Sequence, residues 1–209
     1  MRQDNVLEVE EAISAIIAAG ERAAALGWVP ATSGNFSVRA GEMIAITRTG
    51  RDKGNLRHED IAVVSLDAPL TKGLSAEAAL HLSRYATDAS VGAVFHVHMP
   101  IAATLGRRYL PDGQLLLEGW ELQKAFEGIN DHLARIRIPI LPNSQNVQAL
   151  ADAAEIELRR PSDATTAPGY IVDGHGLNTW GRTSAEAQRN LEAFGALLLL
   201  HAQWLGYCR

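Results

Sequence analysis

The sequence predicts a single layered α/β domain, and three observations support this fold class. The chain has 209 residues, of which 47% are hydrophobic and 21% charged, so it is long enough to bury a core without disulfides. Segments with helical periodicity alternate with segments typical of strands. No internal repeat, low-complexity tract or linker divides the chain, so we expect one domain over residues 1–209.

Charge and cysteine content narrow the possible partners. The formal net charge is −5 and the sequence has no basic cluster, so nucleic acid is not expected to be the main binding partner. The one cysteine, Cys208, excludes an intramolecular disulfide and is typical of a reducing compartment. Neither a signal peptide nor an apolar run of transmembrane length is visible. We therefore expect a cytoplasmic protein that acts on a small molecule and binds no membrane.

The elements follow in order from periodicity and from start and stop signals. Residues 5–26 predict a helix, because apolar side chains such as Val9 and Ile13 recur on one face and Gly27 follows. The predicted strands are a β-prone run ending at Arg39 and residues 43–46, 61–66, 91–99, 136–141, 169–172 and 177–181. Four more helices are predicted. The first runs from just after Glu77 to about Tyr85, and the next two cover residues 119–127 and 146–160. The last begins at the capping box Thr183–Glu186 and ends at about Trp204.

The most informative strand carries two histidines. In a strand, residues i and i+2 point to the same face, so His96 and His98 project together, and Pro100 marks where the ladder must stop. Two such imidazoles are half of a metal site, and His175 is the best candidate for a third ligand, because glycines flank it and it follows an apolar run. A pair of hydrogen-bonded polar residues is the alternative, and the residues alone leave both interpretations open.

Three short turns rich in small polar residues precede or follow the early strands. They are Thr32–Asn35, Thr47–Gly50 and Lys72–Glu77, and the last lies just before a helix. Backbone N–H groups in such turns, and the partial positive charge of a helix N-terminus, can bind an anion. Taken singly each is an ordinary turn, whereas three in one domain favour an anion site.

The order of these motifs resembles the class II aldolase family, zinc enzymes that act on phosphorylated ketoses. The resemblance covers nearly the whole chain and rests on Thr32-Ser33-Gly34-Asn35, Thr49-Gly50, Ser75-Ala76-Glu77, His96-Val97-His98 and Gly174-His175-Gly176. Two further segments, residues 119–124 and 138–143, resemble the branch of this family that dehydrates a methylthio-substituted pentulose phosphate in methionine salvage.

The resemblance implies a fold, a cofactor and a set of site residues. It implies a three-layer α/β/α domain with a mixed, mostly antiparallel central sheet, and one zinc ion per chain. The residues that match metal ligands are His96, His98 and His175, and those that match phosphate-binding positions are Gly34, Asn35, Thr49, Gly50 and Ser75. Ala76 departs from a frequent serine, so one hydroxyl contact to phosphate is absent.

Two glutamates compete for the catalytic assignment. Glu77 matches a base and metal ligand of the aldolases, whereas Glu121 matches the acid/base of the dehydratase branch. Zinc would stabilise an enediolate at C2 and C3 of the ketose, and Glu121 would move the C3 proton to the departing C4 hydroxyl. The alternative interpretation of Glu121 is a solvated residue on a helix face. Its neighbour Trp120 either packs on the methylthio group or lies in the core.

The sequence therefore leaves three possible functions. Dehydration is the first, and an aldolase or 4-epimerase that uses the same zinc chemistry on another sugar phosphate is the second. A binding module without catalysis is the third, because fold alone does not establish function. The resemblance also implies a cyclic homo-oligomer, a tetramer, with active sites near subunit borders.

Overall fold

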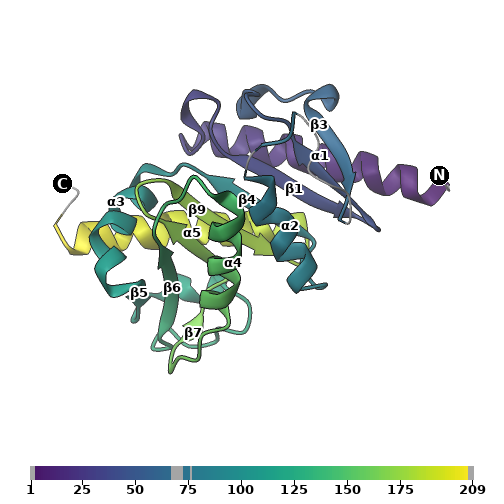
Figure 1. The fold of residues 1–209 in the computed structure, drawn as a ribbon. Coiled ribbons are helices and arrows are strands. Elements are labelled where there is room, and N and C mark those ends of the chain that lie inside the picture. The colour runs from purple at the N-terminus through teal and green to yellow at the C-terminus, as the bar shows by residue number, and fades with distance from the viewer. Residues whose placement is uncertain (1–2, 67–72, 76, 207–209) are drawn as a thin grey trace.

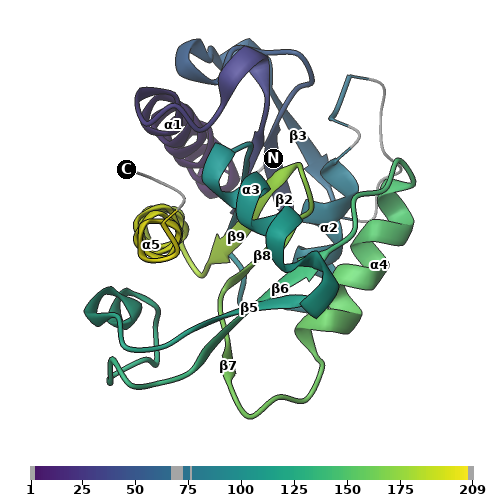
Figure 2. The ribbon, with the colours of Figure 1, turned by 90° about the vertical axis from the view of Figure 1, so that its left-hand side faces the viewer.

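A computed structural model describes residues 3–66, 73–75 and 77–206 of the chain. Lys72, Ala76 and Cys208 lie outside the described residues. Helices cover both faces of a central sheet, so the chain forms three layers, as Figures 1 and 2 show. The predicted α/β/α architecture is confirmed.

The described strands form one nine-stranded sheet. Along its main path the order is β3-β2-β1-β4-β9-β8-β6-β5, and β7 pairs with β6. The strand bounds are β1 Asn35–Ala40, β2 Met43–Thr47, β3 Ile61–Ser65, β4 Ala93–Val97, β5 Gln114–Leu117, β6 Ile136–Leu141, β7 Thr165–Thr166, β8 Gly169–Val172 and β9 Gly176–Gly181. Only the β6–β7 and β6–β8 pairs are parallel among these, which confirms a mixed, mostly antiparallel sheet.

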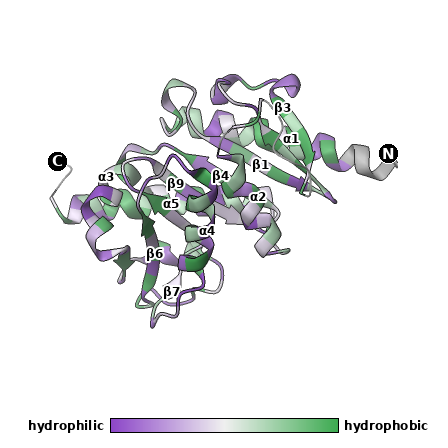
Figure 3. Cartoon of the chain, in the orientation of Figure 1, coloured by the Kyte–Doolittle hydropathy of each residue, from purple (hydrophilic) through white to green (hydrophobic). Residues whose placement is uncertain are grey.

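Five α-helices pack on this sheet. Their bounds are α1 Gln3–Ala25, α2 Ala78–Thr87, α3 Pro100–Tyr109, α4 Val147–Leu158 and α5 Ser184–Trp204. Apolar side chains of α1, α3 and α5 share the main hydrophobic cluster with Phe95 of β4, whereas α2 and α4 cover the opposite face, on which Val94 lies. Strand β6 is largely hydrophobic in Figure 3, because both of its faces are buried.

Local signals fixed several boundaries correctly. The Thr183 hydroxyl accepts a hydrogen bond from the Glu186 N–H at 3.1 Å, so the predicted cap of α5 is confirmed. Asn146 caps α4 in the same way, through the N–H of Ala149. Pro100 ends the strand region as expected, but it also opens α3 at its first turn.

Two features differ from the prediction. Residues 119–127 do not form an α-helix, because only a short 3-10 helix, η5, spans Glu121–Ala125. The buried Gln123 side chain bonds to the Ala134 carbonyl at 2.7 Å, so this segment folds as a turn against its neighbour and not as a continuous helix. The second difference is that the sequence did not predict α3, β5 or β7.

The register of the sheet places three polar residues in one row. Asn35 of β1 pairs with His96 of β4, and His96 pairs with Asn178 of β9, so all three side chains point to the same face. All three residues are buried. Among the described residues, no helix is long and apolar enough to cross a membrane.

Candidate metal centre

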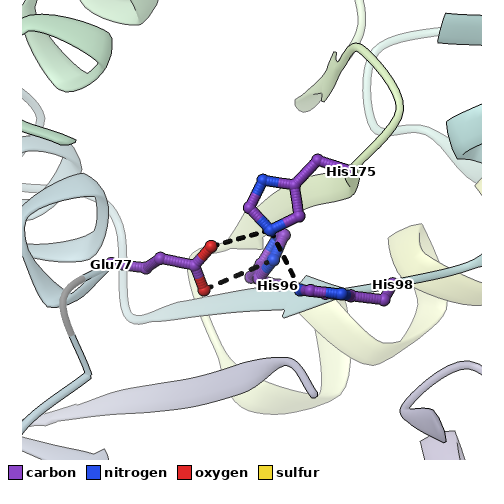
Figure 4. A group of neighbouring side chains, drawn as sticks. All are labelled: Glu77, His96, His98 and His175. Atoms are coloured by element: carbon purple, nitrogen blue, oxygen red, sulfur yellow. Dashed lines mark hydrogen bonds and ion pairs between the residues drawn. The ribbon is translucent and has the colours of Figure 1, made fainter. Parts of the chain in front are cut away.

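Three histidines and one glutamate meet at the end of β4. Figure 4 shows Glu77, His96, His98 and His175 directed toward a common point, and one ligand atom from each lies within 4.8 Å of the others. Glu77 precedes the first residue of α2, His96 is in β4, His98 lies one residue past its end, and His175 is in the turn between β8 and β9. The cluster therefore joins three segments that are far apart in sequence.

His96 is oriented by the neighbouring strand. Its Nδ1–H donates to the Leu177 carbonyl of β9 at 3.0 Å, which leaves Nε2 with a free lone pair. That Nε2 is buried and has no hydrogen-bond partner, although it lies 3.5 Å from Glu77 Oε2. A buried ring nitrogen without a partner, directed at other potential ligands, is the arrangement that a metal ion would satisfy.

His98 and His175 face each other across the same point. Their Nε2 atoms are 3.0 Å apart. The turn that carries His175 can approach β4 because its neighbours are glycines: a Cβ on Gly176 would lie 2.1 Å from the Val97 carbonyl oxygen, and Gly174 has φ +62°. The glycines that drew attention to His175 in the sequence therefore have a steric reason.

Glu77 supplies the negative charge of the cluster. Its Oε1 lies 2.8 Å from His175 Nε2, and its Oε2 accepts a 2.6 Å hydrogen bond from Asn35 Nδ2. Burial by itself would raise the pKa of Glu77, but the surrounding imidazoles outweigh it, and the pKa lies well below its usual range. Glu77 is therefore a carboxylate at neutral pH.

His96 and His98 are neutral at the same pH. Burial lowers the pKa of His96 to about 3, against an attraction from Glu77 that raises it. Burial also lowers the pKa of His98, and His175 lowers it further. Three imidazoles and one carboxylate form a donor set typical of zinc, so the residues present fit such an ion.

The predicted phosphate residues lie around this cluster. Asn35 Nδ2 is 3.4 Å from the Ser75 hydroxyl, so these two adjoin Glu77. Thr49 is tied to the same region, because its N–H donates to the Gly73 carbonyl at 3.1 Å. Gly34 and Gly50 both have positive φ, +75° and +70°, as close turns require. The third turn thus contacts each of the other two turns.

Glu121 lies elsewhere in the chain. It is in η5, its side chain is 72% exposed, and its described ion-pair partners are Lys124 and His132. The strand that leads to it, β5, is four strand steps from β4, about 19 Å at ordinary spacing. Within one chain, the structure does not bring Glu121 to the histidines.

Two buried residues near the cluster were not assigned a role from the sequence. His81 lies one helical turn after Glu77, and its Nδ1 is 2.7 Å from the Ser37 hydroxyl. Its i, i+4 spacing from Glu77 was the signal that could have found it. Lys53 follows the second turn, and its ammonium group is buried beneath the early turns.

Comparisons with known proteins agree with this geometry. Residues 14–201 match the model of the class II aldolase and adducin N-terminal domain family. The chain is 49% identical to a methylthioribulose-1-phosphate dehydratase of a Bradyrhizobium strain. The alignment covers 89% of this chain and 88% of that protein. The chain is 44% identical to a protein of the same name from Parvibaculum lavamentivorans, over 92% of the chain and 93% of that protein. Among solved structures, an L-fuculose-1-phosphate aldolase from Thermus thermophilus matches with a TM-score of 0.73 and 25% identity, over 92% of this chain and 96% of that one.

Proposed function

The chain belongs to the class II aldolase and adducin family, and from this membership we propose that it is a zinc-dependent dehydratase. Its substrate would be 5-methylthioribulose 1-phosphate, and its product 2,3-diketo-5-methylthiopentyl 1-phosphate, a step of methionine salvage. The observation that carries this proposal is the 49% identity, over most of both chains, to a protein named methylthioribulose-1-phosphate dehydratase.

We propose that His96, His98 and His175 hold the zinc ion. The unpartnered Nε2 of His96 and the 3.0 Å approach of the other two Nε2 atoms support this assignment. A zinc ion bound there would act as a Lewis acid toward the carbonyl of the ketose. Glu77 would supply negative charge to balance the zinc ion, because its carboxylate stays ionised beside the imidazoles.

The early turns would hold the phosphate group of the substrate. Gly34, Asn35, Thr49, Gly50 and Ser75 are the proposed contacts. The hydrogen bonds that join Asn35 and Ser75 to Glu77 support the assignment, because a phosphate at C1 must lie within a few bonds of the reacting carbonyl. Short donors and backbone N–H groups suit a phosphate, which is rich in acceptors.

Glu121 is the proposed acid/base. It would remove the C3 proton and deliver it to the departing C4 hydroxyl, so that water leaves and the resulting enol tautomerises to the diketone. Glu77 is the alternative base, but its carboxylate is engaged by Asn35 and His175.

For Glu121 to act, a second subunit must bring it to the zinc site. We propose a cyclic homo-oligomer, a tetramer located in the cytoplasm, in which Glu121 of one subunit faces the histidines of its neighbour. The hairpin around η5 supports an interface, because Leu116, Leu122 and Leu133 on it are 37%, 38% and 59% exposed. Active sites shared in this way would lie at subunit borders.

The decisive experiment is a product analysis with 5-methylthioribulose 1-phosphate. We expect consumption of the sugar phosphate with formation of a diketone, trapped by a dicarbonyl reagent, and no aldehyde fragment. Retro-aldol cleavage would instead release two carbonyl fragments. An aldehyde product from another ketose phosphate, without dehydration of the methylthio sugar, would favour the aldolase alternative. Normal stability without zinc and no turnover would favour a binding module.

A further inference from the structure

Lys53 is a buried cation whose described hydrogen-bond partners are neutral carbonyl groups. It opens the 3-10 helix η2 (Lys53–Asn55), and the residue is 1% exposed. Its Nζ donates to the carbonyl oxygens of Thr32 at 2.7 Å and Arg51 at 2.6 Å. Within the described parts of the chain, these two neutral acceptors are its hydrogen-bond partners, and no carboxylate forms an ion pair with it.

Burial of a charged ammonium group costs free energy, because the group loses its hydration. An ammonium group has three N–H donors and carries its full charge away from water, so it needs a compensating anion or loses its proton. Burial lowers the pKa of Lys53, while the more distant charges of Asp52 and Glu77 raise it. Two carbonyls satisfy two of the three donors and leave one donor and the net charge uncompensated.

The position of Lys53 is fixed by helix α1. A Cβ on Gly20 would lie 2.3 Å from the Lys53 carbonyl oxygen, and a Cβ on Gly54 would lie 2.8 Å from the Ala24 side chain. The backbone of η2 therefore lies in direct contact with α1 at two glycines. This close packing gives the ammonium group a defined place that a surface lysine lacks.

The two carbonyls that Lys53 binds lie in or directly after two of the three turns proposed to bind phosphate. Thr32 is followed by Ser33, Gly34 and Asn35, and Arg51 directly follows Gly50. The first turn is strained: Ala31 and Thr32 have φ +52° and +64°, a region that non-glycine residues seldom adopt. Such strain persists only where the surroundings enforce it, and the bond from Lys53 to the Thr32 carbonyl is one such constraint.

We propose that Lys53 is the fixed positive charge of the phosphate site. From beneath the turns it sets the separation of the Gly34 and Gly50 segments, and its charge attracts the phosphate of the substrate. It is a positioning residue, because its ammonium group is bonded to backbone and is not at the surface. This inference rests on the proposed function, since it assumes that the anion held by the turns is a phosphate group.

The first test uses inorganic phosphate and needs no turnover. We expect Lys53→Met to weaken the binding of inorganic phosphate to the zinc-loaded protein about 10- to 100-fold, the range for loss of one charge-assisted interaction, with unchanged zinc content. Lys53→Arg, which keeps the charge, should recover part of the affinity. Arg57→Met is the matched control, because it removes one exposed positive charge from the same segment and should leave phosphate binding unchanged.

Equal phosphate affinity in folded Lys53→Met and in the unchanged protein would overturn the proposal. In steady-state kinetics the same variant should raise KM for the phosphorylated substrate more than it lowers kcat. A purely structural lysine would instead lower stability and leave phosphate affinity per folded molecule unchanged. If the protein fails to dehydrate the methylthio sugar yet binds phosphate through Lys53, the proposed function fails and this inference stands.

A second measurement covers the case in which Lys53→Met does not fold. The chain contains three lysines, Lys53, Lys72 and Lys124, so ¹³Cε-lysine labelling gives a simple spectrum. In the unchanged protein we expect the Lys53 signal to titrate at lower pH than a free lysine, and inorganic phosphate should move this titration to higher pH, because a bound anion favours the charged form. A titration that does not move at saturating phosphate would contradict the proposal.

Discussion

Acid should destabilise the metal-free protein through its buried histidines. Burial lowers the pKa of His96 to about 3 and that of His81 to about 4, whereas an unfolded histidine titrates near 6.5. Below pH 6.5 the unfolded chain therefore binds more protons than the folded chain, and stability falls as the pH falls. The loss of stability begins near the pKa of an unfolded histidine and continues until the pH reaches the pKa values of the folded state.

The magnitude follows from the linkage relation. Between pH 7.5 and 5.5 each of the two histidines contributes a loss of about 1.4 kcal/mol, so together they lower the free energy of unfolding by about 2.7 kcal/mol. The result depends little on the folded values, because both lie more than one unit below pH 5.5. His98, whose pKa burial also lowers, adds to the loss. Glu77 does not oppose it, because its carboxylate remains ionised in both states above about pH 5.5.

The assay is urea unfolding of chelator-treated protein at both pH values. His81→Gln should reduce the loss by about half, because one titrating group is removed. His58→Gln is the control, since that side chain is 64% exposed and pairs with Glu10 at the surface, and the loss should persist in it. A loss smaller than about 1 kcal/mol in the unchanged protein, or an equal loss in His81→Gln, would refute the reasoning.

The remaining predictions concern the zinc ion and the acid/base. Elemental analysis should find about one zinc ion per chain, and alanine at His96, His98 or His175 should remove it; retention in all three variants would exclude the site. Glu121→Gln should lower turnover about 10²- to 10⁴-fold with zinc still bound, whereas Glu77→Gln should also alter zinc affinity. Mixed oligomers of Glu121→Gln and His98→Ala subunits should regain activity if the sites are shared, and a monomer in light scattering would contradict that arrangement.

The sequence by itself determined the features that depend on local order. The spacing of His96 and His98 indicated a shared face, the glycines around His175 indicated a close approach, and the cap at Thr183 fixed the start of α5. These predictions succeeded because strand alternation, glycine conformation and helix capping involve only a few consecutive residues.

Local sequence patterns also gave one wrong helix and missed strand β5. The apolar and polar pattern of residues 119–127 suits a helix, but hydrogen bonds from Gln123 to carbonyls some ten residues later replace it with a 3-10 turn. The strand β5 exists because it pairs with β6 at the sheet edge, and its own four residues carry too short a pattern to show this.

The tertiary structure alone decided how the site is assembled. The pairing of β1, β4 and β9 places Asn35 beside His96 and gives the His96 ring its Leu177 acceptor, and no sequence spacing encodes either contact. It also separates Glu121 from the histidines within one chain and buries Lys53 beneath the turns. Burial and cross-strand register depend on the whole fold, because they arise from residues far apart in sequence, such as His96 and Leu177, which are 81 positions apart.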